Sequence, residues 1–180
     1  MSYTTYGLLK AMRSHQIDSP SVATSLATGR PNACNQCHLD RTLDWTAGHL
    51  TEWYGMDRPE LSEDEASIAA SILWLLRGDA GQRALLAWSY GWTAAQEVSN
   101  TDWMVPYLAQ LLEDPYAAVR YIAEQSLRTI VAEDSFEYEF LDSAEQRSST
   151  HRRLREAWSQ RSRREQPQLL IDPSGQLDVT

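Results

Sequence analysis

Apolar residues recur at helical spacing through much of the chain, beginning just after residue 40. Between Asp40 and Tyr54 these positions lie three or four residues apart, which places them on one face of a helix. Gly55 follows at once and is typical of a helix end. The pattern therefore predicts a helix over 40–54. Its inward face would consist of Leu43, Thr46, Leu50 and Trp53, with His49 beside them.

Four more helices are predicted between residues 62 and 130, as two helical hairpins. The first opens with the capping box Ser62-Glu63-Asp64-Glu65 and ends at Gly78. The second runs from about 82 to 90, and the third is capped by Asn100-Thr101-Asp102. The fourth runs from about 117 to 130. Its inward positions are Val119, Ile122, Ala123, Leu127 and Ile130.

The two hairpins resemble each other in sequence. Leu75-Leu76 precedes the turn Gly78-Asp79, and 36 residues later Leu111-Leu112 precedes the turn Asp114-Pro115. A repeat of this length is typical of α-solenoids. Two repeats alone leave apolar faces open, so we expect the N-terminal segment and the C-terminal helix to cover them. The residues that follow the two turns at nearly equivalent places are Arg83 and Arg120.

The ends of the chain are less regular. Residues 1–13 have apolar positions at near-helical spacing, whereas 14–35 is rich in Ser, Thr and Pro and is predicted to be a loop. A polar helix is predicted over 143–166, followed by an irregular tail over 169–180. The arginines of this helix could bind an acidic partner. We favour a solvated helix paired with the acidic stretch 133–142. The arginines are Arg152, Arg153, Arg155, Arg161, Arg163 and Arg164.

Composition narrows the classes of partner. The formal net charge is −9 and the pI about 4.9. This acidity argues against nucleic acid and against an anionic membrane surface as partners, and it favours a basic partner. Hydrophobic residues make up 42% of the 180 residues, enough for a core in one domain or two small ones. We expect no membrane span, because no apolar run approaches the roughly 20 residues that one needs.

Both cysteines of the chain stand in one motif, Cys34-Asn35-Gln36-Cys37-His38. C-x-x-C-H is the attachment pattern of c-type haem, in which two thiols bind the haem covalently and the histidine binds its iron. We therefore predict one covalently attached haem c at Cys34, Cys37 and His38. A thioredoxin-like dithiol, half of a zinc site and a motif no longer used remain alternatives. No second C-x-x-C or H-x₃-H completes a zinc site, and no strong strand pattern lies nearby.

Two stretches ahead of the motif carry a family resemblance: RSHQIDSP at 13–20 and RPNA at 30–33. With the motif, they resemble the last haem segment of secreted multihaem c-type cytochromes. In some of these, HEAT-like helical repeats follow directly. Here DWMVP at 102–106 and DPYAAVR at 114–120 resemble such a repeat. The resemblance covers about residues 7–130 and implies an electron-transfer protein of the periplasm or the extracellular space.

The chain departs from that family in two ways. The family carries several C-x-x-C-H motifs and this chain has one, so a relay along stacked haems needs haems from another subunit or from an upstream segment. Residues 1–6 also lack the basic and apolar regions of a secretory leader, although haem c is attached outside the cytoplasm. We expect the chain to be a piece of a longer secreted protein. A removed leader and an absent haem are the alternatives.

Iron held by His38 has one further axial position. The resemblance implies His15 for this distal role, although that histidine could instead serve a haem of an upstream segment. His49 is a weaker candidate, because one rigid helix cannot bring it and His38 to opposite faces of a haem. Met56 and an open position are further alternatives, and His151 is expected at the surface. Two imidazole ligands would give a low potential, and a thioether would raise it.

The sequence as a whole predicts an all-α protein in which a small haem c segment packs on a short HEAT-like α-solenoid. It divides into a haem c-binding segment (1–58), HEAT-like repeats (59–131), and a charged helix with an irregular tail (132–180). The leading hypothesis is a c-type cytochrome domain that transfers electrons to a redox partner protein or another haem-bearing subunit or segment.

Two other classes of function remain open. One is a helical-repeat interaction module with a structural or vestigial haem site. The other is a haem enzyme or ligand sensor with an open iron position. No acid–base pair is evident near the motif, so we favour an electron-transfer protein, which could be a subunit or fragment of a multihaem oxidoreductase, over an enzyme.

Overall fold

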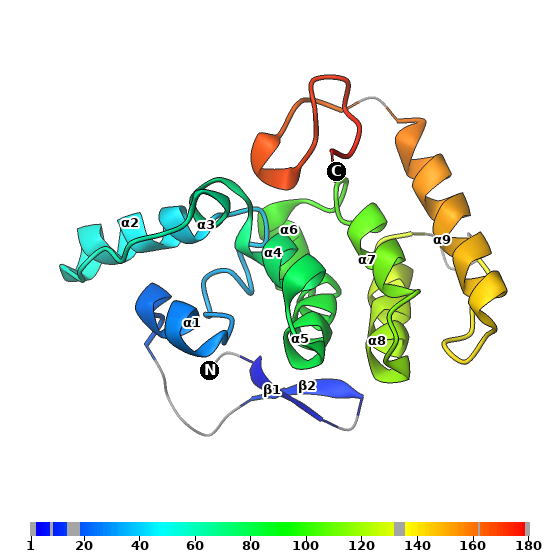
Figure 1. The fold of residues 1–180 in the computed structure, drawn as a ribbon, viewed down its shortest axis with the longest axis horizontal. Helices are drawn as coiled ribbons and strands as arrows, with labels where there is room; N and C mark the ends of the chain where they lie inside the picture. The colour runs from blue at the N-terminus through cyan, green and yellow to red at the C-terminus, as the bar shows by residue number, and fades with distance from the viewer. Residues whose placement is uncertain (1–2, 8, 14–18, 132–135, 162, 179–180) are drawn as a thin grey trace.

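The computed structural model describes residues 3–7, 9–13, 19–131, 136–161 and 163–178. These residues are mostly helical, which confirms the all-α class in its main part. The helices succeed one another roughly in chain order along the longest axis of the molecule (Figure 1). They are α1 Val22–Thr28, α2 Leu43–Tyr54, α3 Glu63–Ser67, α4 Ala70–Arg77, α5 Ala80–Tyr90, α6 Thr93–Ser99, α7 Val105–Leu111, α8 Ala117–Arg128 and α9 Ala144–Ser159, with a 3₁₀ helix at Pro167–Leu169.

The chain begins with a β-hairpin, which the near-helical spacing of residues 1–13 did not predict. Strand β1 (Tyr3–Gly7) pairs antiparallel with β2 (Lys10–Arg13). Both strands pack on α5, and Ala11 joins the main hydrophobic core. A pattern of so few apolar residues does not separate helix from strand, and packing on α5 decides between them.

Helix α1 lies inside the segment 14–35 that was predicted to be a loop. The Ser21 side chain caps it by accepting from the backbone N–H of Thr24 at 3.2 Å, and Gly29 ends it with a φ of 71°. The serines and glycine that indicated a loop are thus the two ends of a short helix. Val22 of α1 packs with α2 and α4 in a smaller second core. The other buried members of that core are Leu43, Ala47, Leu50 and Ala70.

Helix α2 confirms the prediction for residues 40–54, starting three residues late. Thr42 caps it, and Gly55 ends it in the left-handed conformation with a φ of 65°. Leu43, Thr46 and Leu50 are buried as predicted, but Trp53 is 60% exposed. The expected place of Trp53 in the core is therefore wrong. The C-terminal half of α2 extends beyond the neighbouring helices, so little lies there to cover the indole (Figure 1).

The helix predicted to run from 62 to Gly78 is broken in two. The capping box of Ser62 and Glu65 is confirmed, but α3 ends at Ser67 and α4 begins at Ala70. Between them Ile68 is extended. The backbone N–H of Ala69 donates to the carbonyl of Gln168 at 2.8 Å. The C-terminal tail thus accepts the hydrogen bond that the backbone N–H of Ala69 would have donated within an unbroken helix.

Helices α4 and α5 form one hairpin and α7 and α8 the next, and α5 packs on α8. Asp79 and Gln82 form a capping box at the start of α5. Helix α8 confirms the fourth predicted helix, with Val119, Ile122, Ala123 and Leu127 buried and Ile130 partly buried just beyond its end. Two details were wrong: α6 was not predicted, and α7 begins at Val105, after a turn, instead of at a cap in 100–102.

The hairpins contact each other closely. The Ser126 hydroxyl donates to the carbonyl of Ala87 at 2.6 Å, and a Cβ at Gly91 would lie 2.5 Å from the oxygen of Ser126. Only glycine therefore fits at position 91 without moving α8. Nearby, the Arg83 guanidinium donates to the Asp114 carboxylate at 2.6 Å, which joins the first turn of α5 to the turn between α7 and α8.

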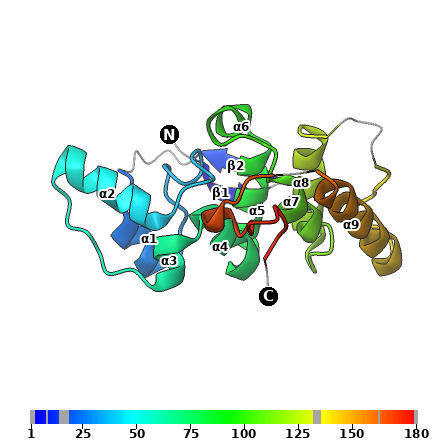
Figure 2. The same ribbon diagram turned by 90° about the horizontal axis from the view of Figure 1, so that it is seen from above.

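Both open faces of the hairpins are covered. Helix α9, shorter than predicted, packs on α7 at one end, while α1 to α3 lie at the other (Figure 2). The tail is irregular as predicted, yet Leu169 and Ile171 are buried, and the Tyr107 hydroxyl donates to the carbonyl of Leu169 at 2.5 Å. Helix α9 thus covers one open side of the hairpins, as predicted. The tail also packs on the hairpins, which was not predicted.

The polar helix α9 and the arginines that follow it form fewer ion pairs than expected. His151, predicted at the surface, is half-buried, and its Nδ1 lies 2.8 Å from the Glu113 carboxylate. Among the ion pairs of the described residues, none joins the six arginines of 152–164 to the acidic residues of 136–142. The interpretation that these arginines pair with the acidic stretch is therefore not supported for its described part.

Candidate haem-attachment site

The C-x-x-C-H motif forms a tight turn between α1 and α2. The backbone N–H groups of Cys37 and His38 both donate to the carbonyl of Cys34, at 3.1 and 2.7 Å. The side chains of Cys34, Cys37 and His38 are partly exposed, whereas Asn35 and Gln36 are buried. The two residues that the motif leaves unspecified are thus the ones that anchor the loop, and the chemically active side chains stay partly exposed.

Asn35 holds the loop to α2. Its side chain is fully buried, and its oxygen accepts from the Thr46 hydroxyl at 2.8 Å and from the Asn32 amide at 2.9 Å. Its own amide donates to the carbonyl of Arg41 at 2.9 Å. Gln36 binds the other side, donating to the carbonyl of Tyr3 in β1 at 2.6 Å. A buried amide satisfied in this way fixes the loop relative to its neighbours.

Two serines hold the end of the motif to the helical hairpins. The Ser99 hydroxyl of α6 accepts from the backbone N–H of Leu39 at 2.8 Å and donates to the carbonyl of Cys37 at 3.0 Å. The Ser71 hydroxyl of α4 donates to the carbonyl of Leu39 at 2.6 Å. Sequence reasoning missed both serines. They lie in helices distant in the sequence and carry no local signal, because their role depends on the tertiary fold.

The thiols are not joined by a disulfide. Burial raises the pKa of both Cys34 and Cys37 above its ordinary value, and in Cys34 this effect exceeds that of a backbone hydrogen bond that lowers it. Such thiols are largely protonated near neutral pH. A thioredoxin-like dithiol needs the opposite, a lowered pKa at the attacking sulfur. The loop is therefore poorly suited to thiol–disulfide exchange.

The imidazole of His38 begins a series of stacked or edge-packed rings along α2. Its ring centroid lies 4.9 Å from that of Trp45, which lies 4.5 Å from His49, which stacks on Trp53 at 4.8 Å. Partial burial is the main reason why the pKa of His38 lies below its ordinary value, and the positive charge of Arg41 adds to it. A neutral imidazole with a free nitrogen is the form that binds iron.

A second aromatic group lies on the other side of the motif. The rings of Tyr3 and Trp88 are 4.0 Å apart, and Trp92 stacks near Trp88 at 6.1 Å. The sulfur of Cys37 lies 4.0 Å from the carbonyl of Ala94, just after Trp92. The motif therefore lies between two sets of aromatic side chains.

The structure places the predicted ligands as follows. Cys34, Cys37 and His38 share one turn, and both His38 and His49 contact Trp45. His15 lies outside the described residues, so its predicted role stays a prediction. Met56 is half-buried and packs against the smaller core. Within the described part of the chain, no three His, Cys, Asp or Glu side chains come together as a metal site.

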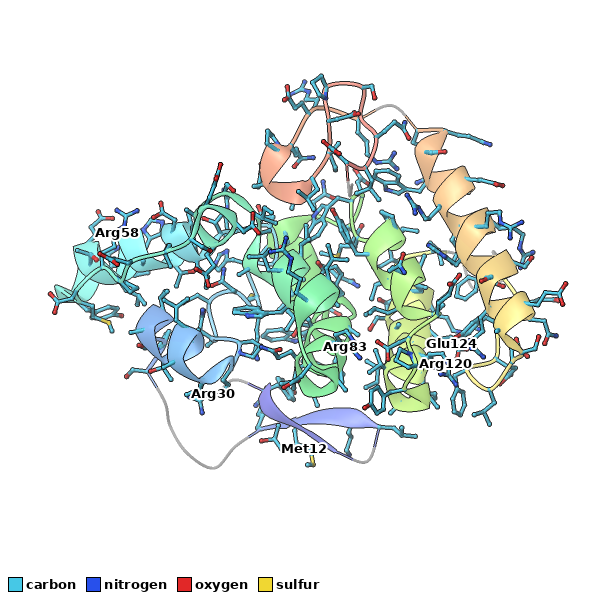
Figure 3. All side chains as sticks on the ribbon, in the orientation of Figure 1. Met12, Arg30, Arg58, Arg83, Arg120 and Glu124 are labelled. Carbon is cyan, nitrogen blue, oxygen red and sulfur yellow. The ribbon has the colours of Figure 1, made fainter. Side chains whose placement is uncertain are left out.

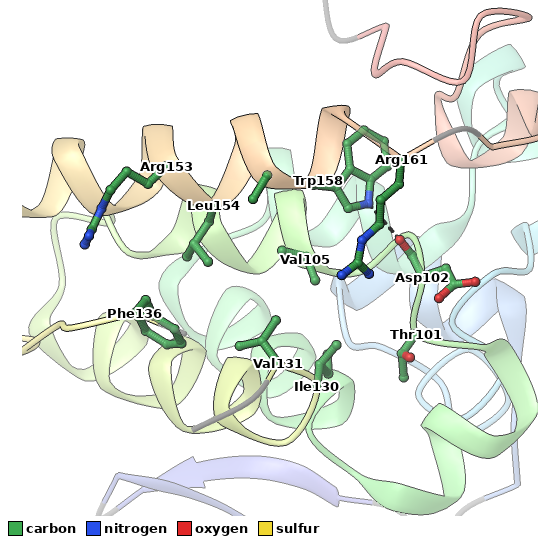
Figure 4. A pocket seen from close by; sticks show the side chains of 11 residues that line it. Thr101, Asp102, Val105, Ile130, Val131, Phe136, Arg153, Leu154, Trp158 and Arg161 are labelled. Carbon is green, nitrogen blue, oxygen red and sulfur yellow. Dashed lines mark hydrogen bonds between the residues drawn. The ribbon is translucent and has the colours of Figure 1, made fainter. Parts of the chain in front are cut away.

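The molecule also has a cavity of about 350 Å³ between α7, α9 and the end of α8 (Figure 4). Its walls are mostly apolar, including Val105, Leu154 and Trp158, with Arg153 and Arg161 at its two ends (Figure 4). None of the motif residues lines it. This cavity is therefore separate from the candidate site.

Comparisons with protein families, curated proteins and solved structures found no match to this chain. Among the helices of the described residues, none has both the length and the apolar character to cross a bilayer.

Proposed function

We propose that this chain is a c-type cytochrome domain that binds one haem c covalently and transfers electrons. The observation that carries the proposal is the tight turn in which Cys34, Cys37 and His38 are all partly exposed while Asn35 and Gln36 are buried. Haem attachment needs two accessible thiols and an imidazole next to the second of them. The alternative of a dithiol enzyme is weakened by the raised pKa of both thiols.

The residues around the motif fit such a group. Cys34 and Cys37 would hold it through thioether bonds, and His38 would bind the iron through its free nitrogen. When bound, a haem supplies one-electron redox chemistry. Asn35 holds in place the loop that would carry the haem. Trp45 contributes apolar ring surface of the kind on which a flat macrocycle packs.

We further propose that α4–α5 and α7–α8 are two HEAT-like repeats. Support comes from one repeated contact. Arg83 donates to the carbonyl of Gly78 at 2.6 Å, and Arg120 donates to the carbonyl of Pro115 at 3.1 Å. Each arginine lies near the start of the second helix of its pair and binds the carbonyl five residues earlier (Figure 3). Repeats of this type need covers at both ends, which here are β1–β2 with the motif segment, and α9.

On the basis of the family resemblance, we propose that His15 is the sixth ligand of the iron. His49 is less suited to the same iron as His38, because Trp45 contacts both imidazole rings. The proposal places the protein in the periplasm or the extracellular space, where haem c is attached. Its partners would be a redox protein or another haem-bearing subunit.

Haem attachment is tested by expressing the chain with a leader in a host that matures c-type cytochromes. Mass spectrometry should show one added haem, and a pyridine haemochrome spectrum should show thioether-linked haem c. Both signals should vanish in Cys34→Ala/Cys37→Ala. An unmodified mass, from cells that mature a control cytochrome c, would overturn the proposal.

The distal ligand is tested by His15→Ala in the same holoprotein. A six-coordinate, low-spin spectrum should become high-spin, while the covalent haem mass stays. His49→Ala is the matched control and should leave the spin state unchanged. If His49→Ala changes the spectrum and His15→Ala does not, the distal ligand is His49.

A further inference from the structure

The C-terminal half of α2 exposes large aromatic side chains. Trp53 is 60% exposed and Tyr54 72%, and the two rings pack edge to face with centroids 6.5 Å apart. Most exposed aromatic residues occur singly, whereas a contiguous pair of this size is typical of a contact surface. Nearer the start of α2, Leu43, Ala47 and Leu50 are buried in the smaller core, whereas the end of the helix extends beyond the neighbouring helices (Figure 1). Trp53 and Tyr54 therefore form an exposed aromatic surface at the C-terminal end of α2, called the aromatic face below.

This exposed face is connected to the proposed haem site by the rings of α2. From His38 the series passes through Trp45 and His49 to Trp53, with successive centroids 4.5 to 4.9 Å apart. Trp45 and Trp53 are eight residues apart, which corresponds to about 12 Å along the helix. Contiguous packing without solvent gaps is what efficient electron tunnelling between two proteins requires. The face with Trp53 and Tyr54 is thus exposed, and two intervening rings, Trp45 and His49, link Trp53 to the proposed iron ligand.

Charge determines what kind of partner fits this face. Residues 40–65, which contain α2 and its flanking loops, hold eight acidic and two basic residues. Their net charge of −6 is most of the −9 of the whole chain. Several carboxylates of this segment are exposed: Glu52, Asp57, Glu60 and Glu63. Of these, Glu52 and Asp57 lie within four residues of both aromatic residues in the sequence. An aromatic centre with an acidic rim complements a basic protein surface.

A second copy of this chain fits less well, although its helix α9 is basic. Residues 143–166 hold seven arginines and three glutamates, a net charge of +4. Helix α9, however, lies at the opposite end of the long axis from α2 (Figures 1 and 2). Contact of α2 with α9 of a second copy would leave the two C-x-x-C-H motifs far apart. The opposed charges instead give each molecule a strong dipole, which orients α2 toward a basic partner.

We infer that the aromatic face of α2 (Trp53 and Tyr54, with the surrounding carboxylates) is the docking surface for a basic redox protein. This inference rests on the proposed function. In the step it describes, a reduced haem held by Cys34, Cys37 and His38 would give up one electron, and the ferric centre of the partner would gain that electron. No covalent bond forms or breaks. Trp53 and Tyr54 position the partner and keep water out of the contact, while the carboxylates guide its approach.

The test uses ferric mitochondrial cytochrome c, a basic haem protein, as the probe for the holoprotein. Stopped-flow absorbance gives the bimolecular rate constant, and calorimetry gives the dissociation constant, each over a range of salt. Trp53→Ala/Tyr54→Ala should lower the rate constant at least fivefold and weaken binding, while the haem mass and spectrum stay unchanged. Tyr116→Ala is the matched control, because Tyr116 is 58% exposed but distant in sequence from α2. It should change neither value.

Neutralising carboxylates of the α2 segment distinguishes the effect of local charge from the effect of the net charge of the protein. Glu52→Gln/Asp57→Asn/Glu60→Gln should lower the rate constant about tenfold at low salt and flatten its salt dependence. The equal-charge control alters three exposed glutamates elsewhere and should change the rate less than about twofold. These are Glu97→Gln, Glu137→Gln and Glu145→Gln.

Each outcome decides one part of the inference. Equal losses in both triple variants would overturn the docking surface, because only net charge would then matter. Calorimetry also works on a chain without haem. If no haem attaches, which overturns the proposed function, binding that depends on Trp53 and Tyr54 in such a chain would still support the docking surface, and binding that does not depend on them would overturn it. Concentration-dependent self-association, measured by sedimentation and lost in the α2 triple variant, would assign the face to a second copy and overturn the redox partner.

Discussion

Replacing Asn35 by alanine should destabilise the protein more than any other change in the motif loop. The Asn35 side chain is 0% exposed and makes three bonds of 2.8 to 2.9 Å, with Asn32, Thr46 and Arg41. Its removal leaves one donor on Asn32, one on Thr46 and the carbonyl of Arg41 without that partner. An unsatisfied buried group costs about 1–3 kcal/mol. Asn32 also reaches Ser25 at 3.4 Å, and the carbonyl of Arg41 still accepts from the backbone N–H of Ala70 at 3.0 Å, so we expect a loss of about 2–4 kcal/mol.

The loss is measured by urea unfolding of the native-sequence chain and Asn35→Ala, followed by tryptophan fluorescence and circular dichroism. Thr46→Val is the graded control. It removes one donor while the Asn35 oxygen keeps its bond from Asn32, so it should cost only about 1 kcal/mol. Asn35→Ala should also reduce the yield of covalent haem, because the loop loses its fixed shape. A loss of less than about 1 kcal/mol in Asn35→Ala would refute the reasoning that this amide holds the loop.

Three further predictions concern the helical hairpins. Val119→Asp places a lone charge at a position that is 1% exposed and should cost at least about 3 kcal/mol in chemical unfolding; melting like the native-sequence chain would show that the repeat register is wrong. Asp114→Ala leaves Arg83 without its carboxylate and should cost about 2–4 kcal/mol. Arg83→Met/Asp114→Leu should recover most of this, and no recovery would contradict the pairing. Burial alone would raise the pKa of Glu113, but hydrogen bonds led by that from His151 lower it, so its carboxylate stabilises the fold above that pKa. The Tm difference between the native-sequence chain and Glu113→Gln should be present at about pH 6 and shrink as the pH falls through the lowered pKa of Glu113, and a difference that stays constant down to about pH 2 would contradict it.

Much of the helical fold was predictable because its apolar spacing is local and its ends carry caps. Gly55 and the Ser62–Glu65 box ended and began helices as expected. The break at Ile68 and Ala69 was not predictable, since it depends on a hydrogen bond to Gln168, about a hundred residues away. Exposure of Trp53 was missed for a related reason. Helical spacing gives the face of a residue, but it does not say where the neighbouring helices end.

The candidate site was predictable only in its reactive residues. The order of Cys34, Cys37 and His38 carries a chemical signature that survives without knowledge of the fold. The anchors of the loop carry none. Ser71 and Ser99 are ordinary helix residues until packing brings their hydroxyls to the backbone of Leu39. A hydrogen bond between distant segments leaves no periodic trace in the sequence, so these roles require the structure.

The buried tail has a consequence for the order of events during synthesis. Leu169 and Ile171 belong to the core, and the carbonyl of Gln168 accepts from the backbone N–H of Ala69, so the native contacts cannot close until residues 168–171 have been made. Cys34 and Cys37 are made far earlier and spend that interval in an open chain. There their thiols escape the burial that raises their pKa in the folded protein, and they are more reactive. Late completion of the core thus keeps the motif chemically accessible until residues 168–171 have been made and have packed.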